Sequence, residues 1–251
     1  MVARLIVLSL LCVSTVYAVS LKDLVARISA ATVSGVDITA NLQHYWYGAN
    51  STNDAGTGGK NLVNVNSTSI TTNGFDFGTG TAYLRTDGPI SNGTAYTVAL
   101  WARPDKTAMD AHPVGGWMLS DRTEPKIDWQ VFYPKTTFRA DYSDSTSGGN
   151  FRTVSGCTPT NNTWTHLAWV VDYSSTTQKM YVNGSFYAGS VADLFPNNGS
   201  TANFCIGGDS WAFAAVLKYH GLLDKIRFYS TAKNDAFIQA VYTADKASKG
   251  L

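Results

Sequence analysis

The chain has 251 residues, of which 44% are apolar and 12% aromatic; this can fill the core of a large domain and excludes a disordered chain. Its 19 basic and 18 acidic side chains nearly cancel, so it lacks the basic excess that nucleic-acid binding needs. Glu124 is the only glutamate, and only 15% of residues are charged. This composition favours short strands joined by polar turns over helices.

The first segment, residues 1–18, is predicted to be a secretory signal peptide. Arg4 supplies the positive charge, an apolar run follows it, and Ala18 ends a stretch suited to cleavage. The alternative is a membrane anchor, but the apolar run has about half of the ~20 residues that a membrane span needs. We therefore expect a secreted, extracellular protein with no membrane span in its mature chain.

Residues 19–37 are predicted to form an N-terminal helical segment. Leu21, Leu24, Val25 and Ile28 lie on one helical stripe, which indicates a short amphipathic helix packed on the following domain. A spacer or a cleaved pro-segment is the alternative.

If the protein is secreted, two covalent modifications are expected. Cys157 and Cys205 remain in the mature chain and are predicted to form a disulfide in an oxidising compartment, with two buried free thiols as the alternative. Asn-x-Ser/Thr sequons predict a glycoprotein if the source glycosylates its proteins. The expected acceptors are Asn50, Asn66, Asn92, Asn161 and Asn198, whereas Asn183 lies in a tight turn and is a doubtful one.

The rest of the chain is a series of short strand-like segments separated by polar turns. The Asn183-Gly184 pair predicts a hairpin, and the stripe of Phe237, Ile238 and Val241 predicts a helix over residues 234–242 with Asn234 as its N-cap. Residues 243–251 are expected to be a loose tail. The predicted strands cover residues 42–47, 69–72, 82–85, 95–102, 117–120, 127–133, 137–142, 151–154, 164–172, 179–187, 204–208 and 222–229. Such a series predicts one all-β sandwich or barrel.

Four of these segments carry a family resemblance. They are the aromatic strand 42–47, the strand 96–104 that reads YTVALWARP, the WTHLAWVVD strand 164–172 with its YVNG turn, and the closing GLLDKIRFY segment with its helix. In this order they resemble the laminin-G-like jelly roll of the concanavalin A-like lectin/glucanase superfamily over residues 38–242. The resemblance implies a two-sheet antiparallel β-sandwich that binds sugars or protein partners, often with a bound calcium ion.

The same resemblance bears on catalysis. Glucanases of the superfamily take both catalytic carboxylates from glutamates in a pattern like E-x-D-x-x-E, which a chain with Glu124 alone cannot form. Pairs of aspartates, at residues 121 and 128 or at 141 and 144, are the remaining alternative. The four histidines show no metal-binding spacing, and no nucleophile motif is present. The sequence therefore predicts a protein without catalytic residues.

Sugar binding needs aromatic rings for the faces of the sugar and polar groups for its hydroxyls. Trp211 follows two glycines and an aspartate in a predicted rim loop, although packing over a sheet edge is an equal alternative for it. Trp129 and Tyr133 could instead belong to the core, where Trp46, Trp101, Trp164 and Trp169 are expected. The candidate ligand-binding residues are Trp117, Trp129, Tyr133, Tyr142, Asp209 and Trp211.

The resemblance also implies a possible calcium ligand, Asp224, with carbonyl partners from the loops near Gly48 and Gly74. The alternative is an aspartate paired with an arginine or a backbone amide. The sequence as a whole predicts a secreted, non-catalytic binding module whose partner is a glycan or a cell-surface or matrix protein. A structural or adhesion protein of a cell surface, matrix or virion is the second interpretation, and a polysaccharide-cleaving enzyme is the third.

Overall fold

The computed structural model describes residues 32–33, 35–48, 51–78, 81–90, 93–110, 116–121, 126–132, 137–144, 150–191, 203–208 and 218–251. The predicted signal peptide and residues 19–31 of the predicted helical segment, with its whole apolar stripe, lie outside these residues. The helical prediction is wrong for the end of that segment, where Thr32–Val33 and Val36–Asp37 pair as two short strands. Among the described helices, none is long and apolar enough to span a membrane.

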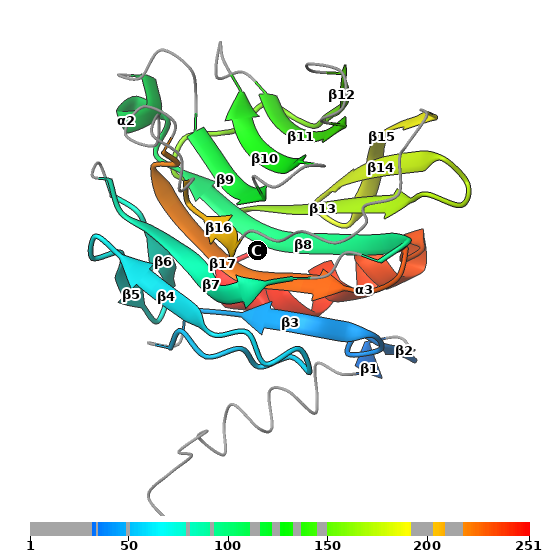
Figure 1. Cartoon of the computed structure of the whole chain (residues 1–251), viewed down its shortest axis with the longest axis horizontal. Coiled ribbons are helices and arrows are strands. Elements are labelled where there is room, and N and C mark those ends of the chain that lie inside the picture. The colour runs from blue at the N-terminus through cyan, green and yellow to red at the C-terminus, as the bar shows by residue number, and fades with distance from the viewer. Residues whose placement is uncertain are drawn as a thin grey trace, which may run out of the picture.

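Two antiparallel sheets form most of the described chain (Figure 1). The first sheet has seven strands, in the order β12 (Asn150–Ser155), β11 (Thr137–Asp144), β10 (Lys126–Phe132), β9 (Gly116–Asp121), β16 (Asn203–Ile206), β7 (Tyr83–Pro89) and β4 (Leu62–Val65). Neighbours in this order that are far apart in the sequence, such as β9 and β16, give the sheet its non-local topology.

The second sheet has eight strands. Its order is β15 (Ser185–Val191), β14 (Thr177–Val182), β13 (Thr165–Asp172), β8 (Ala95–Pro104), β17 (Gly221–Tyr229), β6 (Gly74–Asp76) and β5 (Ser69–Thr71), and β3 (Leu42–Trp46) also pairs with β17. The first half of β17 pairs with β6 and the second half with β3. A small hairpin of β1 (Thr32–Val33) and β2 (Val36–Asp37) precedes β3.

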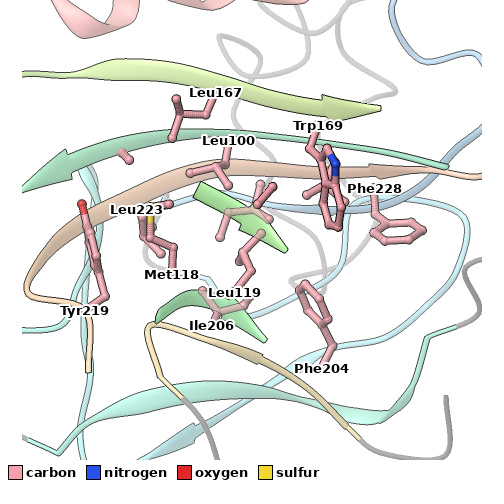
Figure 2. Close-up of a cluster of buried hydrophobic side chains, with 14 of the residues drawn as sticks. Leu100, Met118, Leu119, Leu167, Trp169, Phe204, Ile206, Tyr219, Leu223 and Phe228 are labelled. Atoms are coloured by element: carbon pink, nitrogen blue, oxygen red, sulfur yellow. The ribbon is translucent and has the colours of Figure 1, made fainter. Parts of the chain in front are cut away.

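The main hydrophobic core lies between the two sheets. Figure 2 shows Leu100, Leu167 and Leu223 of the eight-stranded sheet opposite Met118, Leu119 and Ile206 of the seven-stranded sheet. Three of the four tryptophans expected in the core, Trp46, Trp101 and Trp169, are fully buried, whereas Trp164 is only partly buried. The sandwich predicted from the sequence is therefore confirmed.

Helix α3 (Asp235–Lys246) adds a third layer by covering the outer face of the eight-stranded sheet. Its side chains Phe237, Ile238 and Val241 pack against Ala99 and Ala168 of β8 and β13. These two strands are consequently buried on both faces, which explains why they read as nearly continuous apolar runs without the alternation of a half-exposed strand.

The C-terminal segment differs from its prediction. The N-cap is confirmed, since Asn234 accepts a hydrogen bond from the Phe237 amide at 2.9 Å. The helix, however, continues to Lys246, and the 3₁₀ helix η2 (Ala247–Lys249) follows it. The expectation of a loose tail over residues 243–251 is wrong because ion pairs of Asp245 and Lys249 hold this segment against the sheet.

The predicted strands are all found within a few residues of their expected bounds. The sequence pattern did not reveal β4, β6, the β1–β2 hairpin or the five-residue helix α2 (Lys106–Asp110). These elements are short, and β6 begins at Gly74, a residue type that weakens strand propensity.

The predicted disulfide is wrong, because Cys157 and Cys205 are not bonded to each other. Cys205 lies in β16, whereas the Cys157 carbonyl accepts a hydrogen bond from Phe138 of β11. Strands β9 and β10 lie between β16 and β11 in the sheet. Three strand spacings of about 4.8 Å separate β16 from β11, and Cys157 lies beyond β11, after the end of β12. The two cysteines are therefore far beyond the ~7 Å that a disulfide allows between Cα atoms.

We therefore expect the melting temperature to be the same with and without a reducing agent, because no disulfide joins Cys157 to Cys205. Differential scanning fluorimetry with and without dithiothreitol measures this. Thiol titration in denaturant should count every cysteine of the expressed chain as free. A fall in melting temperature on reduction would contradict the arrangement of β16 and β11.

Candidate functional site

The outer face of the seven-stranded sheet, which points away from the main core, gathers most of the predicted site. Alternation along the strands defines this face, since Leu84 of β7 and Ala140 of β11 belong to the core. Their neighbours Tyr83, Arg85 and Arg139 are partly exposed and occupy the opposite face. We call this opposite face the outer face below.

Strand register places a row of mostly polar residues across the outer face. Because paired residues of adjacent antiparallel strands share a face, the row can be followed from one edge of the sheet to the other. In order from β4 to β12 its positions are Val63, Arg85, Cys205, Ser120, Asp128, Asp141 and Thr153. The row thus holds one cation, Arg85, two hydroxyl positions and two carboxylate positions, groups that suit a polyhydroxylated ligand. Its central members Ser120 and Cys205 are buried, at 1% and 2% exposed.

Trp117 reaches the same face through a register shift. The pairing of β9 with β10 slips between Trp129 and Gln130, so that Trp117 is opposite Gln130 rather than in the core row. Gln130 pairs with Arg139, and Arg139 pairs with Ser155. Trp117 is only 8% exposed, so most of its ring is covered and a small part remains accessible. The ring therefore contributes a limited apolar contact surface beside a polar row.

The base of the predicted rim loop lies against Trp117. Gly208 and Lys218 are the described residues on either side of this loop, and Trp117 forms a β-bridge with Lys218. The Lys218 ammonium lies 4.0 Å from the centroid of the Tyr83 ring, a cation–π contact, and Lys218 is only 2% exposed. A Cβ atom at Gly208 would lie 2.5 Å from the end of the Lys218 side chain, so the two residues are in close contact. Sequence reasoning missed Tyr83 and Lys218 because only the bridge between β9 and the segment before β17 brings them together.

The remaining predicted residues have different outcomes. Asp209 and Trp211 of the rim loop, and Tyr133, lie outside the described residues. Trp129 pairs with Leu119 and Ala140, which are both core residues, so its register position is that of the core row. Tyr142 pairs with Ile127 and Arg152. It follows Asp141 along β11, so it is not a member of the row that contains Asp128 and Asp141. The structure thus brings Trp117 and the ends of the rim loop together, and it separates Trp129 from them by register.

The predicted calcium position does not fit a calcium ion, because protein groups already contact both oxygens of Asp224. The Asp224 Oδ1 atom accepts a hydrogen bond from the Gly48 amide at 2.7 Å, and Oδ2 forms an ion pair with the Lys249 ammonium. The Gly48 and Gly74 loops do converge on Asp224, as the resemblance implies, but the Gly48 group that faces it is an N–H donor. A divalent cation needs oxygen ligands, and here an amide and an ammonium occupy both carboxylate oxygens.

The histidines show no catalytic or metal-binding arrangement in the described part of the chain. No group of three or more potential metal ligands occurs there. His166 is fully buried between the rings of Trp101 and Tyr242, and burial lowers its pKa to about 3. A fully buried ring cannot come within hydrogen-bond reach of a substrate, so His166 is a packing residue, as the sequence indicated.

His44 also has a structural role, which it fills by contacting Asp54 in the loop after β3. Its Nδ1 atom lies 2.7 Å from Asp54 Oδ2, and Asp54 also accepts hydrogen bonds from the amides of Tyr45, Gly56 and Lys60. Burial alone would raise the pKa of Asp54, but these hydrogen bonds lower it below its ordinary value. The carboxylate therefore fixes the loop after β3 and has no oxygen left for catalysis.

The described sequons lie at turns. Asn66 and Asn161 are exposed, and Asn161 Oδ1 accepts a hydrogen bond from the Lys106 amide at 2.8 Å. Asn50, Asn92 and Asn198 lie outside the described residues. Glycosylation at these positions stays a prediction.

The comparisons with known proteins identify the family. A family model of the laminin-G type, described as "Concanavalin A-like lectin/glucanases superfamily", matches residues 77–239. The match spans about two thirds of the chain, so the chain belongs to this family. A search of curated proteins found no match.

Solved structures share the fold at low sequence identity. Domain 4 of AbnA, a GH43 extracellular arabinanase from Geobacillus stearothermophilus solved with arabinotriose, is 17% identical with a TM-score of 0.61, covering 80% of this chain and 98% of that one. The ligand binding domain of botulinum neurotoxin serotype D with N-acetylneuraminic acid is 13% identical with a TM-score of 0.66, covering 87% and 52%. The receptor binding domain of botulinum neurotoxin D is 12% identical with a TM-score of 0.66, covering 83% and 54%. This chain thus spans about half the length of the toxin structures.

Proposed function

We propose that the protein is a secreted, non-catalytic module that binds carbohydrate on the outer face of its seven-stranded sheet. The observation that carries the proposal is the row of polar positions from Arg85 to Thr153 with Trp117 beside it. Arginine and hydroxyl groups suit the oxygens of a sugar, and the accessible part of an indole ring suits its apolar face.

Two structures that share this fold support the carbohydrate class. The arabinanase domain was solved with arabinotriose and the toxin domain with N-acetylneuraminic acid. A shared fold does not determine the ligand, so the support is for the class of ligand and not for either sugar. The support for secretion is the signal-peptide pattern of residues 1–18.

The test is binding to an array of neutral, sialylated and arabinose-containing oligosaccharides, followed by titration of the best glycan. We expect Arg139→Ala to weaken binding about tenfold or more, because it removes a charged hydrogen-bond donor from the outer face. Trp211→Ala tests the rim loop in the same assay. Circular dichroism checks that the variants fold.

A matched control comes from the other sheet, at its edge strand β15. Phe186 and Tyr187 on β15 are 54% and 52% exposed and belong to the eight-stranded sheet. We expect Phe186→Ala and Tyr187→Ala to bind glycans as the unmodified protein does. If these changes abolish binding and Arg139→Ala does not, the ligand site lies on β15 and the proposed outer-face site is wrong. Absence of any glycan binding would favour a structural or adhesion protein that contacts other proteins.

One observation keeps an enzyme as a second candidate. Asp128 and Asp141 are direct register partners on adjacent strands, which is a different pairing from those that spacing along the sequence indicated. Retaining glycosidases need two carboxyl groups about 5 Å apart. Release of reducing ends from a polysaccharide, abolished by either Asp128→Asn or Asp141→Asn, would establish catalysis and overturn the non-catalytic proposal.

A further inference from the structure

Four separate segments meet around the carboxylate of Asp224. Gly48 follows β3, Asn73 lies in the turn between β5 and β6, Asp224 is in β17, and Lys249 ends η2. The Gly48 amide donates to Asp224 Oδ1 at 2.7 Å, and the Lys249 ammonium pairs with Oδ2. The segments that hold these four residues are far apart in the sequence, so this cluster is a tertiary feature.

The Lys249 ammonium lies where a bound cation would lie. It is almost fully buried, it contacts the Asn73 carbonyl oxygen at 3.5 Å, and it lies 4.1 Å from the centroid of the Trp164 ring. A carboxylate, a carbonyl and an aromatic face are three groups that each attract positive charge. Trp164 is partly buried, and its ring contacts this charge.

Glycines allow the backbone segments to approach this closely. A Cβ atom on Gly48 would overlap the backbone of Gly74, and Gly74 has a φ of +141°, a conformation that other residues rarely adopt. A Cβ at Gly74 would lie 2.7 Å from the Leu223 carbonyl oxygen. The cluster is thus built by the backbone around a central position rather than by flexible surface side chains.

We infer that Lys249 supplies an internal cation at the place where the family resemblance implies calcium, so that the C-terminal 3₁₀ helix replaces a metal ion in holding β3, the β5–β6 turn and β17 together. The one carboxylate of the cluster is neutralised by one ammonium. A calcium ion can enter only if the Lys249 side chain leaves. The ordered C-terminal segment is then a structural requirement of the domain.

The experiment compares Lys249→Ala with Lys249→Met. Both changes leave Asp224 without its cation, and we expect both to lower the melting temperature by ~5 °C or more. Alanine also opens space for a hydrated ion, whereas methionine fills that space with an uncharged chain. Millimolar calcium should therefore raise the melting temperature of Lys249→Ala by roughly 2 °C or more and should not change that of Lys249→Met.

The unmodified protein and Asp224→Asn complete the design. We expect calcium and EDTA to leave the melting temperature of the unmodified protein unchanged. A calcium-induced increase in the unmodified protein that is lost in Asp224→Asn would overturn the inference, because calcium would then bind this position in the presence of Lys249. A Lys249→Ala variant that melts like the unmodified protein, or one that does not respond to calcium, would also overturn it.

Discussion

Replacing Asp245 by asparagine is expected to reduce the free energy of unfolding by about 3–5 kcal/mol. Asp245 of α3 is 2% exposed, and its two oxygens accept hydrogen bonds from both terminal nitrogens of Arg227. The Lys225 ammonium is also bonded to it, at 2.9 Å. The substitution would leave the buried guanidinium of Arg227 without a counter-charge, and arginine cannot lose its proton.

The electrostatics of this cluster explain why the effect is large. Burial alone would raise the pKa of Asp245, but the attraction of Arg227 and Lys225 outweighs it and holds the pKa well below its ordinary value. The Arg227 guanidinium also lies 4.4 Å from the centroid of the Tyr45 ring. Asp245 therefore connects α3 to the centre of β17 and contributes more than an exposed ion pair.

Urea unfolding followed by tryptophan fluorescence measures the loss. The control is Asp110→Asn, which removes the half-exposed ion pair of Lys106 and should cost ~0.5 kcal/mol or less. The double variant Asp245→Asn with Arg227→Met should be more stable than Asp245→Asn alone, because it removes the unpaired charge together with its partner. A loss below ~1 kcal/mol in the single variant would show that Arg227 is solvated in solution.

Acidification from pH 6.5 to pH 4.5 is expected to destabilise the protein by about 2–3 kcal/mol through His166. Burial lowers the pKa of His166 in the folded state to about 3, and no described residue accepts or donates a hydrogen bond at either ring nitrogen. In the unfolded chain the pKa returns to about 6.5. The unfolded state therefore binds a proton in this pH range while the folded state does not, and stability falls as the pH falls.

The variant that isolates this effect is His166→Phe, which keeps an aromatic ring between Trp101 and Tyr242. We expect its stability to change less between pH 6.5 and pH 4.5 than that of the unmodified protein, by about 2–3 kcal/mol. At pH 7.5 it should be as stable or more stable, since it removes two buried polar atoms without partners. His166→Leu serves as a second variant if phenylalanine is too large. Parallel pH curves for both variants and the unmodified protein would show that another group causes the acid sensitivity.

The sequence indicated the strands well because each carries its own local signal. The apolar run of β13 and the Asn183-Gly184 turn are visible without knowledge of the rest of the chain, and the turn adopts the positive φ values that a two-residue hairpin needs. The disulfide prediction failed because cysteine pairing depends on distance in space. Cys205 is in β16 and Cys157 follows β12, and the strand order places β9, β10 and β11 between these two strands.

The candidate site could be predicted only in part, for a similar reason. Trp117 was identified as an aromatic residue near a strand end, but its place on the outer face depends on a register shift between β9 and β10. Lys218 and Tyr83 meet through strands that are distant in the sequence. The residue types along a single strand do not show which residues of distant strands will be in contact.

By itself the sequence determined the fold class, most strand positions and the N-cap of α3, because alternation, turn residues and capping act over a few neighbouring residues. Only the tertiary structure decided what neutralises Asp224 and where Asp245 lies. Both outcomes depend on a bulge in β17, where Lys225 has a φ of +49° and the pairing with β8 slips between Asp224 and Arg227. The slip lets Asp224, Lys225 and Arg227 all reach the C-terminal segment, and burial then makes these long-range ion pairs strong enough to order it.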